Sequence, residues 1–326
     1  MNTAPLLNAE GIKAHFPVKA GPLSPLKGVV RAVDGVDLSL YRGETLGLVG
    51  ESGCGKSTLG RALLGLIPIT GGRVQLEGTS VLDQPPAKLK AMRREMQLIF
   101  QDPFAALDPR QTVGNAVRVA LDINNIGKRS ERQQIVEDIF AEVGLRPEHT
   151  HRFPHEFSGG QRQRVVIARA LVLRPRFVVC DEPVSALDVS VQAQILNLLK
   201  RLQQDHQLTY LFVSHNLGVI EYMADRVAVM YYGKIVEIAE RTELFRQPRH
   251  PYTRALMAAV PAPDPTARAD ELPMLGEPPD PMFLPDGCRF RNRCPMAIER
   301  CALEEPALIA VSSTHQSACW RNNTLI

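Results

Sequence analysis

The stretch GESGCGKST, residues 50–58, constrains the fold of this chain more than any other feature. It follows a short apolar run, ETLGLV, and precedes a run with helical character. Its three glycines allow the backbone to curl so that successive N–H groups point inward at an anion, and the helix that follows adds its positive N-terminal end. The sequence therefore predicts a phosphate-binding loop between a buried strand and a helix, in an α/β core.

The two residues that follow the last glycine define the expected chemistry of this loop. We expect Lys56 to reach the β- and γ-phosphates of a nucleotide and the hydroxyl of Ser57 to bind Mg²⁺. A chance glycine-rich turn is the alternative, and the strand and helix on either side argue against it. The predicted ATP-binding residues of the loop are Gly50, Glu51, Ser52, Gly53, Cys54, Gly55, Lys56, Ser57 and Thr58.

A second motif, RFVVCDEP at residues 176–183, places two carboxylates at the end of an apolar run. At such a strand end Asp181 can hold the hydration shell of Mg²⁺, while Glu182 can act as the general base for a water molecule. A surface acidic pair is the alternative interpretation. It is disfavoured because the apolar run would then carry charge toward the core without a reason.

Two further polar side chains also follow apolar runs. Gln101 ends MQLIFQ, where it is predicted to contact Mg²⁺ and the attacking water, and His215 ends TYLFVSH, where it is predicted to bind the γ-phosphate. A structural role is the alternative for the histidine. The catalytic interpretation is favoured because sheets of this type bind their ligands at the carboxyl ends of the strands.

The remaining sequence predicts how the chain is organised. Continuous apolar runs favour a central parallel sheet covered on both faces, and earlier β-rich segments predict an antiparallel layer. Residues 226–240 are expected to form a hairpin that turns near Gly233. Residues 191–204 have helical spacing, and the pattern from about 102 to 160 is mainly helical. After about residue 246 proline becomes frequent, which is typical of a linker-like extension.

Composition excludes several classes of protein. Hydrophobic residues make up 44% and charged residues 22% of the 326 residues, as in ordinary soluble proteins. The net charge of +3 is too small to indicate nucleic-acid binding. The N-terminal residues do not resemble a signal peptide, and no run approaches the roughly 18 apolar residues that span a bilayer. Any role at a membrane is therefore expected to depend on partners.

The segment FSGGQ, residues 157–161, predicts a second anion-binding helix start without a lysine. Its Ser158, Gly159 and Gly160 would lie beside the same nucleotide or face away from it. In the second arrangement, they would complete a nucleotide site on another chain. Two chains arranged head to tail would then enclose two nucleotides.

The order of these motifs resembles that of the ATP-binding cassette (ABC) ATPases. GESGCGKST, Gln101, FSGGQ, VVCDEP, SALD and His215 occur in that family's order, with phenylalanine at residue 157 where leucine is usual. The resemblance implies that Ser158, Gly159, Gly160, Gln161 and Asp188 act at the partner's ATP. It also implies a P-loop NTPase (RecA-like) core with an antiparallel β subdomain and an inserted helical subdomain that contacts membrane subunits. The predicted domains are a nucleotide-binding domain at 1–245, with the helical insert at about 102–160, and a small Pro/Cys-rich extension at 246–326.

Members of this family stack an aromatic side chain on the adenine. Phe16, at the end of the first predicted strand, is the candidate for that role in this chain. An ordinary core aromatic is the alternative interpretation.

Several longer segments, including RHPYTRAL at residues 249–256, resemble the peptide-importer branch of the family. This resemblance implies an ATPase that powers import of dipeptides, oligopeptides or a related solute. The implied partners are two transmembrane permease subunits, a second homologous ATPase and, indirectly, an extracytoplasmic solute-binding protein. The implied location is the cytoplasmic face of the membrane.

Two other functions were weighed against that prediction. A soluble ABC-type ATPase acting on nucleic acid or the ribosome usually carries two cassettes or a long coiled coil, and this chain shows one cassette and no heptad run. A non-catalytic regulatory subunit would be expected to lack Lys56, Glu182 or Ser158, and all three are present. Both alternatives are therefore disfavoured.

Four of the six cysteines lie near the C-terminus, at Cys288, Cys294, Cys301 and Cys319. Their spacing is not that of the close pairs in most structural zinc sites, so an iron–sulfur cluster, zinc and no metal stay open. The resemblance to the peptide-importer branch, some members of which carry a [4Fe–4S] cluster in this tail, favours that cluster. The nearby Arg289, Arg291 and Arg293 offset the cluster's charge or form a solvated face. Cys54 and Cys180 are expected to be packing residues.

Overall fold

The computed structural model describes residues 4–19, 21, 26–259 and 274–322. Its contacts divide the chain into two compact units. The first unit comprises Met1–Leu40, Thr45–Ser80 and Ser214–Ile326, and the second comprises Tyr41–Glu44 and Val81–Val213. The two units are described separately below. The domain limits expected from the sequence stay predictions.

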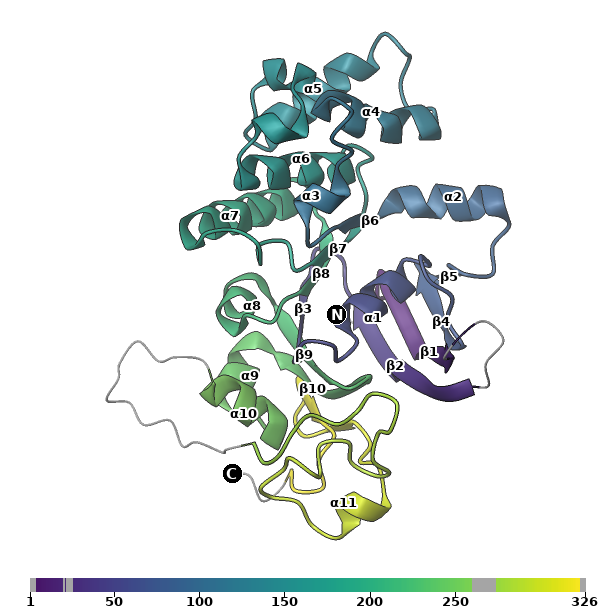
Figure 1. Cartoon of the computed structure of the whole chain (residues 1–326), viewed down its shortest axis with the longest axis vertical. Helices are drawn as coiled ribbons and strands as arrows, with labels where there is room; N and C mark the ends of the chain where they lie inside the picture. The colour runs from purple at the N-terminus through teal and green to yellow at the C-terminus, as the bar shows by residue number, and fades with distance from the viewer. Residues whose placement is uncertain (1–3, 20, 22–25, 260–273, 323–326) are drawn as a thin grey trace. The chain divides into compact units, whose positions relative to one another are not determined.

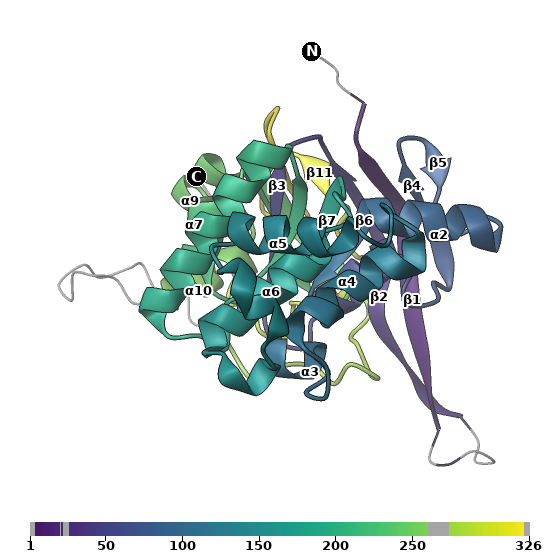
Figure 2. The ribbon, with the colours of Figure 1, turned by 90° about the horizontal axis from the view of Figure 1, so that it is seen from above.

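The first unit contains the antiparallel layer that the sequence predicts. The strands β1 (Leu7–Lys19), β2 (Leu26–Leu40), β4 (Gly71–Leu76) and β5 (Thr79–Ser80) lie in the order β2-β1-β4-β5. Figure 2 shows β1 and β2 side by side as a long, twisted two-stranded ribbon. Every pairing in this layer is antiparallel, which confirms the sequence prediction.

A mixed sheet forms the rest of the first unit. Strand β3 (Thr45–Val49) pairs in parallel with β9 (Arg226–Tyr231), which turns at Gly233 into the antiparallel β10 (Lys234–Glu240). The C-terminal extension adds β12 (His315–Ser317) and then β11 (Ile309–Ala310) beside β10. The predicted hairpin is thus confirmed, and the extension continues the sheet that carries β3. The helices of this unit are α1 (Lys56–Leu63), α8 (Leu217–Met223), α9 (Arg241–Arg246), α10 (Pro251–Ala258) and α11 (Arg300–Leu303).

The second unit is built on three parallel strands. These are β8 (Thr209–Val213), β7 (Phe177–Asp181) and β6 (Met96–Ile99), in that order, and all residues of β7 and β8 are buried. Continuous burial explains why these strands appear in the sequence as unbroken apolar runs rather than as alternating ones. The helices of this unit are α2 (Pro86–Glu95), α3 (Pro103–Ala106), α4 (Val113–Asn124), α5 (Arg132–Glu142), α6 (Gly159–Leu171) and α7 (Val189–His206). Figure 1 shows α4, α5 and α6 gathered as a helical group.

An aromatic cluster anchors the extension to the first unit. Phe290 is 1% exposed, and its ring centroid lies 5.3 Å from Tyr231, 5.4 Å from Tyr252 and 5.9 Å from His250. These rings come from β9, α10 and the segment just before α10. Of the predicted proline-rich linker, the part that includes VPAPDP lies outside the described residues, whereas residues 247–252 lead into α10.

Among the described residues, no helix combines the length and the apolar character needed to cross a bilayer.

Replacing Phe290 tests whether this cluster holds the extension. Phe290→Ala is expected to lower the free energy of unfolding by about 3–5 kcal/mol, because it removes a fully buried ring and leaves a cavity. Thermal unfolding of the purified protein measures the loss. Phe283→Ala is the matched control, since Phe283 lies in the same extension but is 69% exposed. Its effect is expected to stay within about 0.5 kcal/mol, and equal losses in both variants would contradict the anchoring role.

Candidate nucleotide site

The glycines of the phosphate loop are required by close backbone contacts. The loop joins β3 to α1, and Gly50 and Gly55 have φ angles of 152° and 110°. A Cβ atom on Gly50 would lie 2.2 Å from the carbonyl oxygen of Met230, and one on Gly55 would lie 2.0 Å from that of Ala32. No side chain fits at such distances, so the loop conformation depends on glycine at both positions.

Lys56 lies at the first position of α1 and is 5% exposed. Its amino group donates to the carbonyl oxygens of Gly50 at 2.7 Å and Glu51 at 2.8 Å. Cys54 is buried, as predicted, and burial raises the pKa of its thiol, so it is a packing residue. The loop thus holds the positively charged amino group of Lys56 close to its own backbone. A positive charge at this place favours the binding of phosphate.

Two residues that the sequence analysis did not assign to the site contact this loop. The guanidinium of Arg293 donates to both carboxylate oxygens of Glu51, at 2.7 and 3.0 Å. The backbone N–H of Glu51 donates to the hydroxyl of Tyr252 at 2.8 Å. Tyr252 belongs to RHPYTRAL, which the sequence analysis used only as a mark of the importer branch.

Of the three arginines in the basic run of the extension, Arg289, Arg291 and Arg293, two are buried rather than solvated. Arg289 and Arg293 are 9% and 6% exposed, and they form ion pairs with Asp34 and Glu51. The interpretation as a solvated face was therefore wrong for both, because each guanidinium is buried against a carboxylate far away in sequence. Arg291 is half-buried and donates to backbone carbonyls within the extension.

The predicted acidic pair lies in the second unit. Asp181 ends β7 and is 3% exposed. Glu182 has a φ of 47°, an unusual value for a residue with a side chain, and its N–H donates to the carbonyl of Val213 at 3.0 Å. The amide of Gln101 donates to the Glu182 carboxylate at 2.9 Å. The structure therefore brings Gln101 and Glu182 together, as expected for residues that act on one water.

His215 and Phe16 belong to the first unit. His215 is exposed and follows Ser214, whose N–H donates to the carbonyl of Leu48 at 3.2 Å. It thus lies beside the end of β3, which leads into the phosphate loop. The strand that carries Phe16 continues to Lys19, past its predicted end. Phe16 is 38% exposed, so the alternative of a core aromatic was wrong, while its stacking role stays a prediction.

The segment at residues 158–161 forms the start of α6. Ser158 is the N-cap: its hydroxyl accepts from the N–H of Gln161 at 3.3 Å, and the Gln161 side chain accepts from the N–H of Ser158 at 3.0 Å. This reciprocal capping fixes the helix start, and Ser158 stays exposed. The predicted anion-binding helix start is therefore present in the fold.

The two glycines after Ser158 allow α6 to approach the start of α7. A Cβ atom on Gly160 would lie 2.4 Å from Cγ1 of Val191, and one on Gly159 would lie 3.3 Å from Cδ2 of Leu187. Asp188, the exposed N-cap of α7, follows Leu187 directly. Two residues predicted to act at a partner's ATP, Ser158 and Asp188, therefore lie on either side of one tight helix contact.

The four C-terminal cysteines are free, and Cys301 is the most buried of them. The N–H of Cys288 donates to the carbonyl of Cys301 at 2.8 Å. Burial, with smaller contributions from Cys301, Cys294 and Cys319, raises the pKa of the Cys288 thiol to about 12. Within the described part of the chain, however, no three His, Cys, Asp or Glu side chains are arranged to hold a metal ion.

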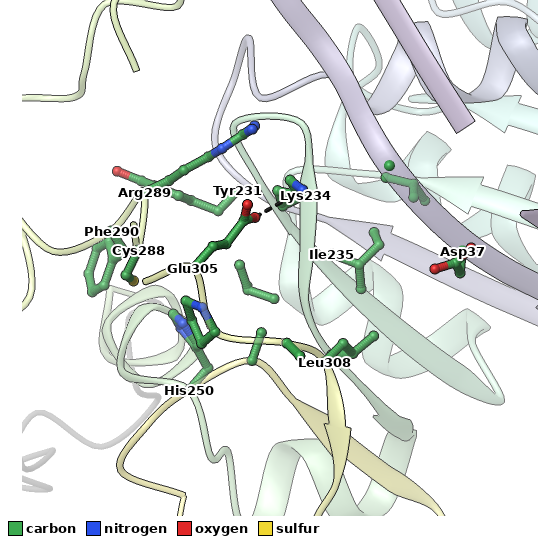
Figure 3. Close-up of a pocket in the computed structure, with 16 residues that line it drawn as sticks. Asp37, Tyr231, Lys234, Ile235, His250, Cys288, Arg289, Phe290, Glu305 and Leu308 are labelled. Carbon is green, nitrogen blue, oxygen red and sulfur yellow. Dashed lines mark ion pairs between the residues drawn. The ribbon is translucent and has the colours of Figure 1, made fainter. Parts of the chain in front are cut away.

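A cavity of about 440 Å³ lies between β10 and the extension (Figure 3). Lys234 and Glu305 form an ion pair of 2.9 Å at its wall, and Cys288 also lines it. Burial lowers the pKa of His250, another lining residue, to about 4, so its imidazole is neutral at pH 7. Its described lining contains none of the predicted ATP-binding residues. The nucleotide site is thus defined by its motifs and not by this cavity.

Comparison with known proteins agrees with these features. A family model described as "ABC transporter" matches residues 33–185, and one described as "Oligopeptide/dipeptide transporter, C-terminal region" matches residues 236–301. A putative peptide import ATP-binding protein of Brucella ovis is 48% identical over 323 residues, covering 99% of this chain and 100% of that protein. The oligopeptide transport ATP-binding protein AppF of Bacillus subtilis is 44% identical over 321 residues, with 98% of each chain covered.

Solved structures share the fold. A dimer of an ATP-binding cassette in a post-hydrolysis state, bound to ADP and Pi, has a TM-score of 0.63 and 26% identity. The match covers 72% of this chain and 98% of that one. Fold, motifs and relatives together define an ABC-type ATPase with a P-loop NTPase core. The chain belongs to the ATP-binding proteins of the ABC transporter family that carry the oligopeptide/dipeptide transporter C-terminal region.

Enlarging Gly160 tests the close approach of α6 and α7. Gly160→Ala is expected to lower the free energy of unfolding by about 1–3 kcal/mol, because the new methyl group overlaps the side chain of Val191. Chemical denaturation of the purified protein measures the change. Adding Val191→Ala should recover part of the loss by removing the methyl groups that clash. If the second substitution only adds to the loss, the close contact is not what requires glycine at this position.

Proposed function

We propose that this chain binds and hydrolyses ATP to power import of dipeptides, oligopeptides or a related solute through a membrane permease. The contact between Gln101 and Glu182 beside Asp181, at the end of a buried strand, is the observation that carries the hydrolytic part. The names of the similar proteins, which are peptide and oligopeptide transport ATP-binding proteins, support the choice of solute class.

In the proposed mechanism the phosphate loop binds the triphosphate and Lys56 neutralises charge on its β- and γ-phosphates. Ser57, Gln101 and Asp181 would supply the oxygen ligands that Mg²⁺ prefers, and Mg²⁺ held there would stabilise negative charge on the phosphates. Glu182 accepts a proton from the attacking water, and Gln101 holds that water in line with the γ-phosphate. His215 donates to a γ-phosphate oxygen. Catalysis thus rests on positioning and electrostatics.

A second ATPase chain completes this proposed site. Ser158, Gly159, Gly160, Gln161 and Asp188 would approach the γ-phosphate bound by the partner's loop. The exposure of Ser158 and its place at a helix N-terminus support this role, because the helix start presents N–H groups to an anion. A similar cassette was solved as a dimer with ADP and Pi, which also supports pairing. The partner is a homologous ATPase or a second copy of this chain.

The permease is proposed to bind the helical part of the second unit. Phe104 on α3 and Ile123 on α4 are 63% and 58% exposed, so their apolar side chains would be available for contact with a permease. The chain would then act at the cytoplasmic face of the membrane, beside two permease subunits, and would meet the solute-binding protein only indirectly. The alternative function on nucleic acid or the ribosome gains no support from a net charge of +3.

Glu182→Gln tests the role of the general base. The variant is expected to bind MgATP while its hydrolysis rate falls at least about 100-fold, because the amide cannot accept the proton from water. It should also accumulate as an ATP-bound dimer, which size-exclusion chromatography coupled to light scattering would detect. Glu277→Gln, the same change at an exposed position of the extension, is the control. Hydrolysis by Glu182→Gln within a few fold of the wild-type rate would remove Glu182 from this role.

We also propose that Cys288, Cys294, Cys301 and Cys319 hold a [4Fe–4S] cluster, with Zn²⁺ as the alternative. All four thiols are free, and the backbone N–H of Cys288 donates to the carbonyl of Cys301 at 2.8 Å, which brings these two residues together. Four thiolates match the ligand set of such a cluster, and the side chains would have to turn toward a common centre to bind it. A structural role is proposed, because a bound cluster would link the two loop segments that carry Cys288 and Cys294 to α11 and to the residues just after β12.

Metal analysis distinguishes these outcomes. Protein purified without oxygen is expected to be brown and to contain close to four iron atoms per chain, the content of one [4Fe–4S] cluster. Cys301→Ser should lose most of this iron and the visible absorbance, whereas Cys180→Ser, at a buried position in β7, should keep both. About one zinc per chain would favour the alternative. Protein that contains neither metal would contradict the proposal.

A further inference from the structure

The ion pair between Arg293 and Glu51 links the C-terminal extension directly to the phosphate loop. Arg293 lies in the segment between α10 and α11, and Glu51 is the second residue of GESGCGKST. The pair is bidentate, with N–O distances of 2.7 and 3.0 Å, and the two side chains are 8% and 22% exposed. A planar guanidinium held against a carboxylate in this geometry is the strong form of such a pair.

Glu51 places a negative charge in the very loop that has to receive the negatively charged phosphates of ATP. Without a partner, its carboxylate would repel a triphosphate, and limited exposure to water would leave that repulsion poorly screened. Arg293 reduces this repulsion, since its positive charge balances the Glu51 carboxylate within the protein.

Other contacts of the extension hold Arg293 in place. The N–H of Arg293 donates to the carbonyl of Phe290 at 2.9 Å, and Phe290 is fixed in the aromatic cluster with Tyr231 and Tyr252. The hydroxyl of Tyr252 also accepts from the N–H of Glu51. Both the side chain and the backbone of Glu51 are therefore held by residues that follow the predicted nucleotide-binding domain in sequence.

We propose that Arg293 is a positioning residue for ATP binding, which neutralises Glu51 and fixes its carboxylate away from the bound phosphates. The C-terminal extension thereby takes part in nucleotide affinity, in addition to any metal that it holds. This inference rests on the proposed nucleotide site at the phosphate loop. It predicts that loss of Arg293 weakens nucleotide binding because the charge on Glu51 is then unpaired. Removing that charge should restore the affinity.

A double-mutant cycle on the full chain tests the proposal. Isothermal titration with Mg²⁺ and the non-hydrolysable analogue AMP-PNP gives the dissociation constant of each variant. Arg293→Met is expected to weaken binding about tenfold, because it leaves the Glu51 carboxylate unpaired near the phosphates. In the Glu51→Gln background the same replacement should cost less than about twofold. The tenfold loss should also shrink as NaCl is raised, because salt screens the repulsion.

Two variants and a stability measurement separate this role from a purely structural one. Arg300→Met makes the same change at an arginine of the extension that pairs with Glu304 and stacks on Trp320, and it should leave the dissociation constant within about twofold. Arg293→Lys keeps the charge and should retain most of the affinity, which provides a test if Arg293→Met does not fold. Thermal unfolding of every variant shows whether the affinity loss is accompanied by global destabilisation.

The possible results separate this inference from the proposed function. A wild-type chain that does not bind the analogue would contradict the nucleotide site itself. Wild-type binding with an Arg293→Met variant that is unchanged would overturn only the inference. It would also be overturned if Arg293→Met caused the same loss with and without Glu51→Gln, because the arginine would then act independently of the carboxylate.

Discussion

The backbone conformation of the phosphate loop is the constraint on which the rest of the site depends. Gly50 and Gly55 adopt φ angles that favour glycine, and each lies against a carbonyl of a neighbouring strand, from Met230 on β9 and Ala32 on β2. The N–H of Gly233, at the turn after β9, also donates to the carbonyl of Cys54 at 2.9 Å. Two sheets of the first unit therefore shape a loop that carries only a few side chains of its own.

The C-terminal extension also supports the phosphate loop, through strand pairing and through two buried arginines. Its strand β12 pairs with β10, and the buried Arg289 binds Asp34 and the carbonyl of Tyr232, next to the turn that contacts Cys54. Arg293 reaches Glu51 directly. Burying two guanidinium groups is costly unless each is paired, and here both partners are carboxylates of the nucleotide-binding part. The extension thus packs as a continuation of the first unit, and two buried ion pairs link it to that unit.

Local sequence predicted most of the fold because its signals are local. The glycine spacing of residues 50–55, the apolar runs before Asp181 and His215, and the turn at Gly233 each depend on neighbours along the chain. The pair between Arg293 and Glu51 joins residues that are 242 positions apart, and no periodicity or motif marks it. The end of the strand that carries Phe16 was missed for a related reason, since the length of that strand is set by pairing with β2. The sequence thus predicted the proposed catalytic groups, whereas contacts between distant parts of the chain determine which residues support the phosphate loop.

The central claim is that each nucleotide chamber combines the phosphate loop of one chain with the Ser158 helix start of another. Mixing two inactive variants tests it most directly. Lys56→Ala disables the loop and keeps the helix start, whereas Ser158→Arg keeps the loop and blocks the helix start. If chambers are shared, a mixture of the two at high concentration should hydrolyse ATP well above the sum of their separate rates. A mixture that stays at that sum would contradict the account.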